Sequence, residues 1–137
     1  MSKMTWITQE EIVDKFHWSA ELNLAEEMNE EGYFYDLSKW QFGNGRMKLI
    51  HDMLLEMSNF FESIDKNPGV TIYEVKDVFG FLRVDLFSTH QNIYSIKEHY
   101  EKLSEVTCSE CGDSGTLRLM KDRSMVLCES CHYDRLF

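Results

Sequence analysis

The sequence predicts an α+β fold, with N-terminal helices, a β-hairpin and a further helix, followed by a small cysteine-rich ribbon. Three observations predict it. Apolar residues recur at helical spacing from residue 44 to about residue 65, β-branched and aromatic residues gather between residues 70 and 87, and all four cysteines lie in the last 30 residues. We expect a helical and β-hairpin domain over residues 1–105 and a ribbon over residues 106–137 packed onto it.

The N-terminal segment carries the start and stop signals of two helices. Thr8 and Glu11 have the spacing of a capping box, which predicts a helix that begins near Thr8. Ser19 can cap a second helix, which Gly32 would end. The segment Tyr33–Gln41 is rich in aromatic residues. We expect it to be an ordered connection whose rings serve packing and not a cofactor.

The longest helix is expected from Asn44 to about Asp65. The turn sequence Asn67-Pro68-Gly69 follows it and is incompatible with a continuing helix. The apolar residues of this stretch repeat every three or four positions, so they share one buried face. They are Met47, Ile50, Met53, Leu54, Met57, Phe60, Phe61 and Ile64.

Two strands and a helix are expected next. Val70–Val75 and Phe81–Phe87 have the composition of strands, and the chain would reverse between them through Lys76, Asp77 and Gly80. This arrangement predicts a β-hairpin. Alternate residues of the second strand would line one face, namely Leu82, Val84 and Leu86. The helix that leads into the cysteines would bury a stripe formed by Ile93, Ile96, Tyr100 and Leu103.

The cysteines form two C-x-x-C pairs, Cys108 with Cys111 and Cys128 with Cys131, separated by residues 112–127. Each such pair can present two thiolates to one ion, and two pairs complete a tetrahedron. Four thiolates would leave no open position for a substrate or water, so the pattern predicts one structural zinc ion. The short strands Leu117–Leu119 and Met125–Leu127 would join the two pairs as a zinc ribbon.

The charge of the chain is strongly and unevenly negative. Fourteen basic and 24 acidic residues give a net charge of −10, and residues 1–65 hold 13 of the acidic and five of the basic side chains. Such a surface repels nucleic acid and attracts a protein partner with a basic surface. The densest carboxylate cluster is the candidate partner-binding surface, and the alternative is a solvated helix face. Its members are Glu26, Glu27, Glu30, Glu31 and Asp36.

The sequence contains no pattern typical of a membrane span or of a catalytic site. No apolar run approaches the roughly 20 residues of a membrane span, and the first residues lack the apolar segment of a signal peptide. No catalytic motif is present, and the histidines outside the ribbon, at positions 17, 51, 90 and 99, are isolated from one another. We expect a protein of the cytoplasm that is not an enzyme.

Zinc ribbons often bind nucleic acid, so the ribbon has an alternative interpretation. Residues 106–137 contain four basic and five acidic side chains, a net charge of −1, which attracts phosphate only weakly. Arg118, Lys121 and Arg123 could still form a local basic patch. The alternative function is therefore that of a zinc-ribbon accessory protein that binds nucleic acid. A scaffolding role is a third possibility.

The C-terminal half resembles a group of small proteins of phages and prophages. Val75–Arg83 reads V-K-D-V-F-G-F-L-R, similar to the strand-turn-strand motif V-K-x-x-F-G-G-L-R of that group. The similarity continues in Cys108–Arg118 and in Leu127–His132, which match C-x-x-C-G-x-x-G-x-L-R and L-C-x-x-C-H. It covers roughly residues 70–135. Phe81 departs from the pattern, because the group usually has a second glycine at that position.

A phage origin implies a function for a small acidic protein of this kind. It is similar in these respects to zinc-containing anti-CRISPR proteins, which inhibit Cas9-type effectors in the bacterial host cell. These effectors hold nucleic acid in positively charged channels. The resemblance implies an inhibitor that evades host defence by binding such a nuclease and blocking the loading of target DNA. The oligomeric state and the contribution of the ribbon to partner contact stay open.

Overall fold

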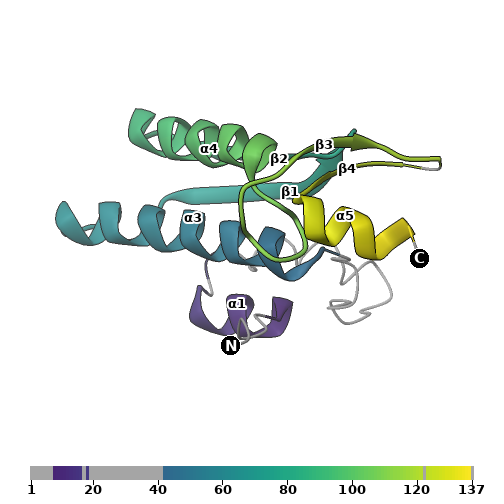
Figure 1. The fold of residues 1–137 in the computed structure, drawn as a ribbon. Coiled ribbons are helices and arrows are strands. Elements are labelled where there is room, and N and C mark those ends of the chain that lie inside the picture. Colours follow the sequence, from purple (N-terminus) through teal and green to yellow (C-terminus); the bar gives the residue numbers. More distant parts are fainter. Residues whose placement is uncertain (1–7, 17, 19–41, 122, 137) are drawn as a thin grey trace, which may run out of the picture.

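A computed structural model describes residues 8–16, 18, 42–121 and 123–136 (Figure 1). It confirms the α+β fold, with helices, two antiparallel hairpins and a C-terminal group of four cysteines. Helix α4 and the short 3-10 helix η2 are continuous in sequence. The described elements, in chain order, are α1 Gln9–Lys15, α3 Asn44–Ser63, β1 Val70–Val78, β2 Phe81–Ser88, α4 Gln91–Leu103, η2 Ser104–Val106, β3 Thr116–Leu119, β4 Ser124–Leu127 and α5 Glu129–Leu136.

Helix α1 begins with the predicted capping box. The backbone N–H of Glu11 donates to the hydroxyl of Thr8 at 3.0 Å, and the N–H of Thr8 donates to the carboxylate of Glu11 at 2.9 Å. Ile12 and Phe16 are buried against α3 as part of the main core. The predicted second helix and the connection Tyr33–Gln41 lie outside the described residues.

Helix α3 is the longest of the described helices and forms one wall of the main core. It runs from Asn44 to Ser63, close to the predicted range. Its buried face meets α4 and the β1–β2 hairpin, and these elements enclose one continuous apolar cluster. The residues that α3 contributes to this cluster are Met47, Ile50, Met53, Leu54, Met57 and Phe61.

Strands β1 and β2 form the predicted hairpin, but its turn differs from the prediction. Lys76 pairs with Arg83 and Asp77 with Leu82, so β1 continues to Val78, and placing Lys76 and Asp77 in the reversal was wrong. Only residues 79 and 80 form the turn, with φ angles of 54° and 99°. Two successive positive φ angles match the right-handed twist of paired strands, which allows the ladder to extend to the turn.

Strand β2 packs its apolar face into the core and is held by α4 along its length. Leu82, Val84 and Leu86 are buried, as predicted. Side chains of α4 and η2 accept hydrogen bonds from backbone N–H groups of β2. Leu82 donates to the hydroxyl of Ser104 at 3.0 Å, and Val84 donates to the carboxylate of Glu101 at 2.8 Å. These bonds satisfy polar groups that burial would otherwise leave unpaired.

The ribbon forms a second, smaller hairpin and cluster. Strand β3 pairs with β4 in antiparallel register, from Thr116 with Leu127 to Leu119 with Ser124. Cys108, Met125 and Leu127 are its buried centre. Within the described residues, no helix is both long enough and apolar enough to cross a membrane.

Candidate metal centre

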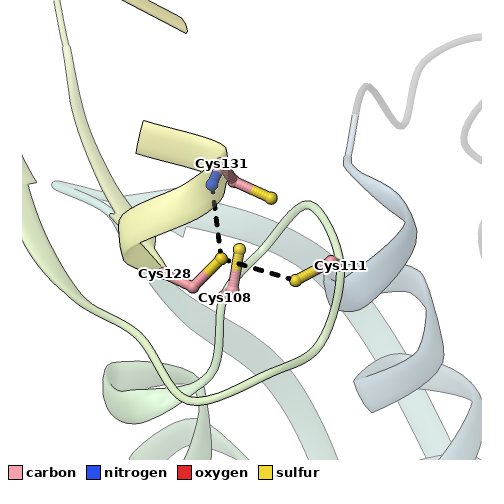
Figure 2. A group of neighbouring side chains, drawn as sticks. All are labelled: Cys108, Cys111, Cys128 and Cys131. Atoms are coloured by element: carbon pink, nitrogen blue, oxygen red, sulfur yellow. Dashed lines mark hydrogen bonds between the residues drawn. The ribbon is translucent and has the colours of Figure 1, made fainter. Parts of the chain in front are cut away.

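The four cysteines converge on one point from two separate parts of the chain (Figure 2). Cys108 and Cys111 lie on the loop after η2, Cys128 follows β4, and Cys131 lies in the first turns of α5. Their sulfur atoms all lie within 4.8 Å of one another, and the sulfurs of Cys111 and Cys128 are 3.6 Å apart. The predicted ligand set is therefore assembled in three dimensions.

The spacing of the sulfurs fits a single metal ion. Four thiolates at about 2.3 Å from a tetrahedral zinc ion lie about 3.8 Å from one another. The 3.6 Å between Cys111 and Cys128 is close to this value, and it is far longer than the roughly 2 Å of a disulfide bond. Cys108 is completely buried, and the other three cysteines are half-buried. The site can hold one metal ion at the edge of the ribbon.

Both cysteine pairs are shaped by local backbone bonds. In the first loop the N–H of Gly112 donates to the carbonyl oxygen of Cys108 at 2.9 Å, and Gly112 has a φ angle of 89°, which favours glycine. In the second pair the N–H of Cys131 donates to the sulfur of Cys128 at 3.4 Å.

Helix α5 was not predicted from the sequence, although it carries one of the ligands. It is short, and the C-x-x-C pattern that it contains is more familiar as a loop motif. Signals for it exist, because Glu129 lies in its first turn and Arg135 in its last turn, which suits the helix dipole at both ends. Cys128 and Cys131 are therefore spaced by the start of a helix, which places both sulfurs on one side.

The acidities of the metal-free thiols differ widely. Burial raises the pKa of Cys108, but backbone N–H groups of Cys128, Cys111 and Glu110 outweigh burial and lower it to about 7. Burial raises the pKa of Cys111 to about 11, and burial together with the neighbouring sulfurs raises that of Cys131 further. Cys108 is thus more readily ionised than Cys111 and Cys131, whose raised pKa values favour the protonated thiol at neutral pH until a cation replaces the proton.

The first cysteine loop caps the start of α3. The N–H of Gly45 donates to the carbonyl oxygen of Glu110 at 3.1 Å, and that of Arg46 donates to Ser109 at 3.0 Å. Both N–H groups belong to the first turn of the helix, where backbone N–H groups have no acceptor within the helix itself. Glycine is required for this contact, because a Cβ at Gly45 would collide with the carbonyl oxygen of Cys108 and would lie 2.5 Å from the nitrogen of Gly112.

The ribbon also contacts the turn of the β1–β2 hairpin. A Cβ at Gly80 would lie 2.8 Å from a methyl group of Leu117 and 3.2 Å from the backbone of Ser124. Arg46 extends from α3 to the same turn, where it donates to Gly80 at 3.1 Å and to Asp77 at 3.3 Å. The predicted boundary at residues 105 and 106 therefore separates segments that are joined by direct hydrogen bonds.

Among the remaining predicted site residues, the structure describes only the three basic residues of the ribbon. The acidic cluster of residues 26–36 lies outside the described residues. Arg118 is half-buried and donates through Nε to the carbonyl oxygen of Leu127 at 3.3 Å, so it supports the β3–β4 hairpin. Lys121 and Arg123 are exposed near the turn of that hairpin.

Two of the histidines that are isolated in sequence, His51 and His90, pack against other side chains of the fold. His51 lies 3.0 Å from a carboxylate oxygen of Asp52 and contacts the ring of Phe16. His90 packs edge-on against Phe60 and Phe61.

No protein family, curated protein or solved structure shows a significant match to the chain. The resemblance to small phage proteins stays a prediction based on the hairpin and cysteine motifs.

Proposed function

We propose that the four cysteines bind one structural zinc ion. The observation that carries this proposal is the convergence of four sulfurs within 4.8 Å, with no other type of ligand in the group that the described residues form. Four sulfur ligands in tetrahedral spacing favour zinc or an iron–sulfur centre over magnesium or calcium, and zinc ribbons use this ligand set. A closed shell of four thiolates has no free position for a reactant, so the proposed role is structural.

The proposed ion would hold together three parts of the fold. It would join the loop that caps α3 to β4 and to α5, because its ligands come from all of these places. The cluster around Cys108, Met125 and Leu127 is small. A small apolar cluster contributes little folding free energy, and in modules of this size the metal supplies much of it.

We further propose that the zinc-stabilised fold presents an acidic segment to a basic protein partner in the bacterial host cell. The partner class is a nucleic-acid-dependent defence nuclease, and a Cas9-type effector is the leading candidate. The support is electrostatic. Residues 19–41 contain six acidic side chains and one basic side chain, and the whole chain has a net charge of −10. An acidic surface can compete with DNA for a positively charged channel, which would block target loading.

The place where this segment meets the described fold supports the same proposal. Residue 42 directly follows the acidic segment in the chain, and Gly43 is the N-cap of α3. The first cysteine loop anchors the helix at that point through the bonds of Gly45 and Arg46. A fixed attachment lowers the entropy cost that a segment pays when it binds a partner.

The test is inhibition of DNA cleavage by a purified Cas9-type effector with its guide RNA. The zinc-loaded chain is expected to inhibit when added before target DNA and to lose effect when added afterwards. Neutralising the five carboxylates of the acidic cluster to their amides should weaken binding about tenfold or more, as expected for several lost charge contacts. A matched control neutralises five exposed acidic residues elsewhere, namely Glu10, Glu62, Asp85, Glu98 and Glu129.

The outcomes separate the competing functions. Absence of binding to the effector would contradict the proposed partner. Equal weakening by the two five-fold variants would show that only net charge matters, and it would contradict the assignment of the cluster. Tight, salt-sensitive binding of the chain to short DNA or RNA duplexes would favour the alternative nucleic-acid-binding function.

A further inference from the structure

A cavity of about 280 Å³ lies where the first cysteine loop, the start of α3, the end of β1, β4 and α5 meet. It does not include the sulfur atoms and is distinct from the metal centre. Five elements separated in sequence contribute to its wall. The charged and hydroxyl-bearing residues that matter for its chemistry are Arg46, Asp77, Ser109, Glu110, Arg123 and Arg135.

Arg46 is a buried cation in the wall of this cavity with incomplete hydrogen bonding. The residue is 1% exposed. Its two Nη atoms reach Asp77 and Gly80, but its Nε has no hydrogen-bond partner among the described residues. Burial lowers the pKa of Arg46, and the nearby carboxylate of Asp77 does not fully offset this. A buried charge in this state is stabilised by a further anion.

Ser109 adds a second unpaired group to the same wall. Its hydroxyl oxygen is buried and has no hydrogen-bond partner among the described residues. Unpaired buried polar groups are uncommon in folded proteins, because each costs about 1–3 kcal/mol. Both of the unpaired groups, in Arg46 and Ser109, belong to residues that line one cavity. The polar groups of this wall are therefore incompletely paired.

The charges of the wall leave one cation unmatched. Arg46 faces Asp77 at 3.3 Å, and Arg135 faces Glu110 at 2.7 Å. Arg123 also lines the cavity and has no carboxylate partner among the described residues. The cavity therefore carries an excess positive charge on a chain whose net charge is −10.

We propose that this cavity binds the phosphate group of a small molecule. The residues that line it include three arginines, from α3, from the turn before β4 and from α5. A tetrahedral phosphate offers acceptor oxygens in several directions, whereas one guanidinium fork already satisfies a planar carboxylate. Arg123 and Arg135, at the exposed rim, contact the phosphate. Arg46 supplies charge from the wall.

The cavity is coupled to the metal centre through the first cysteine loop. Ser109 and Glu110 lie between the ligands Cys108 and Cys111, so their positions depend on the loop that the ion holds. Coupling between two binding sites is reciprocal. Removing the metal weakens phosphate binding, and bound phosphate raises the affinity of the site for the metal in competition with a chelator.

The experiment is titration of the zinc-loaded full chain with inorganic phosphate and, separately, with a mononucleotide, at constant ionic strength. Calorimetry and thermal unfolding provide the readouts. Saturable binding and a rise in melting temperature are expected with both probes. Arg123→Gln should weaken phosphate affinity about tenfold, because one charge-assisted contact is lost. Lys121→Gln is the matched control, since it removes the same charge two residues away and does not line the cavity. It should leave the affinity unchanged.

Four results would overturn the proposal. The first is the absence of saturable binding at millimolar phosphate. The second is equal weakening by Arg123→Gln and Lys121→Gln, which would indicate a diffuse charge effect. The third is equal affinity for acetate and phosphate, which would contradict the tetrahedral ligand. The fourth is phosphate binding only after the acidic cluster of residues 26–36 is neutralised, which would assign the cavity to the carboxylates of the chain itself.

Discussion

The backbone N–H of Gly45 donates to the carbonyl oxygen of Glu110 at 3.1 Å and thereby joins the first turn of α3 to the first cysteine loop. This bond connects the longest helix of the main core to the candidate metal centre. The loop that presents two thiolates also satisfies the start of the helix. Metal binding and the stability of α3 should therefore depend on each other.

Gly45→Ala tests this junction directly. Helix propensity alone would favour alanine by about 1 kcal/mol. The added Cβ would collide with the backbone of Cys108 and Gly112, which cannot move without displacing the cysteines. We expect the steric clash to outweigh the gain in helix propensity. The free energy of unfolding, measured by urea denaturation, should fall by about 1–3 kcal/mol.

Gly69→Ala is the control for that substitution. Its Cβ would lie 3.8 Å from the ring of Phe61, which is an ordinary contact. It should leave stability unchanged or raise it by about 0.5 kcal/mol through the unfolded state. Equal effects of the two alanines would contradict a special role for Gly45.

Removal of the metal should unfold the ribbon before the main core. Elemental analysis is expected to find one zinc ion per chain, and Cys108→Ser should lower the melting temperature, because Cys108 is the buried ligand. In small zinc-finger peptides the apparent binding free energy of the ion is about 10–16 kcal/mol, so the loss should be large. Ser130→Ala, an exposed position in the second pair, is the control. A Cys108→Ser variant that melts like the parent chain would contradict a structural ion.

Metal affinity should fall as the pH falls. Protons compete with the metal for the thiolates, and in the metal-free protein the pKa of Cys111 is raised to about 11 and that of Cys131 further. Metal binding therefore depresses these pKa values and releases protons at neutral pH. The stability supplied by the metal is present at neutral and higher pH and is lost on acidification. The metal affinity can be measured by competition with a chelator at several pH values between about 5 and 8. It should decrease steadily as the pH is lowered. A pH-independent affinity would contradict four thiolate ligands.

The sequence was sufficient for features that local patterns encode. The capping box of Thr8 and Glu11, most of the apolar face of α3 and the two C-x-x-C pairs depend on neighbouring residues, and the structure confirms them. Placing Ile64 on the buried face was wrong, because it lies just past the end of α3 and is 38% exposed. The end of β1 was predicted too early, because Lys76 and Asp77 are polar and resemble turn residues. They stay in the strand, since Gly80 and the residue before it make a two-residue turn.

Features that depend on contacts between distant segments could not be predicted. Arg46 lies within a helix at a position that suits a solvated residue, yet tertiary contacts with Asp77 and Gly80 bury it. In the sequence, Gly45 is only a residue of low helix propensity. Its role follows from the close approach of the cysteine loop, which leaves no room for a Cβ. The cavity follows from both contacts, so no linear motif could have indicated it.

The pairing of Arg46 with Asp77 should be more important for stability than the ion pairs on the surface. Asp77→Asn keeps an oxygen for the N–H of Gly80, which donates to Asp77 at 2.7 Å, but it removes the charge that faces Arg46. Asp77 is 40% exposed, so water can replace part of the interaction. We expect a loss of about 1.5–3 kcal/mol in the free energy of unfolding.

Glu74→Gln is the comparison for this charge removal. Glu74 pairs with Lys76 at 3.4 Å on the exposed part of the same strand. Exposed pairs contribute about 0–1 kcal/mol, so the effect of Glu74→Gln should be small. If both substitutions had the same small effect, the buried arginine would not depend on its carboxylate.

Phe79 occupies a position that stability alone does not favour. Its ring is 84% exposed, and its φ angle of 54° lies in the left-handed region, where a bulky side chain costs about 1 kcal/mol. Asn followed by Gly is the preferred pair for a turn of this type. Phe79→Asn should therefore raise the free energy of unfolding by about 0.5–1 kcal/mol.

The same substitution at Phe87, which is 52% exposed within β2, should instead lower stability, because asparagine is a poor strand residue and loses apolar contact. Opposite effects of Phe79→Asn and Phe87→Asn on stability, measured by thermal unfolding, would show that the backbone is strained at Phe79.

The exposed ring of Phe79 lowers the stability of the free protein, so we expect it to contact a partner. Phe79→Asn should then weaken partner capture while it stabilises the free protein. A variant that is more stable and still binds normally would contradict a contact role for this ring.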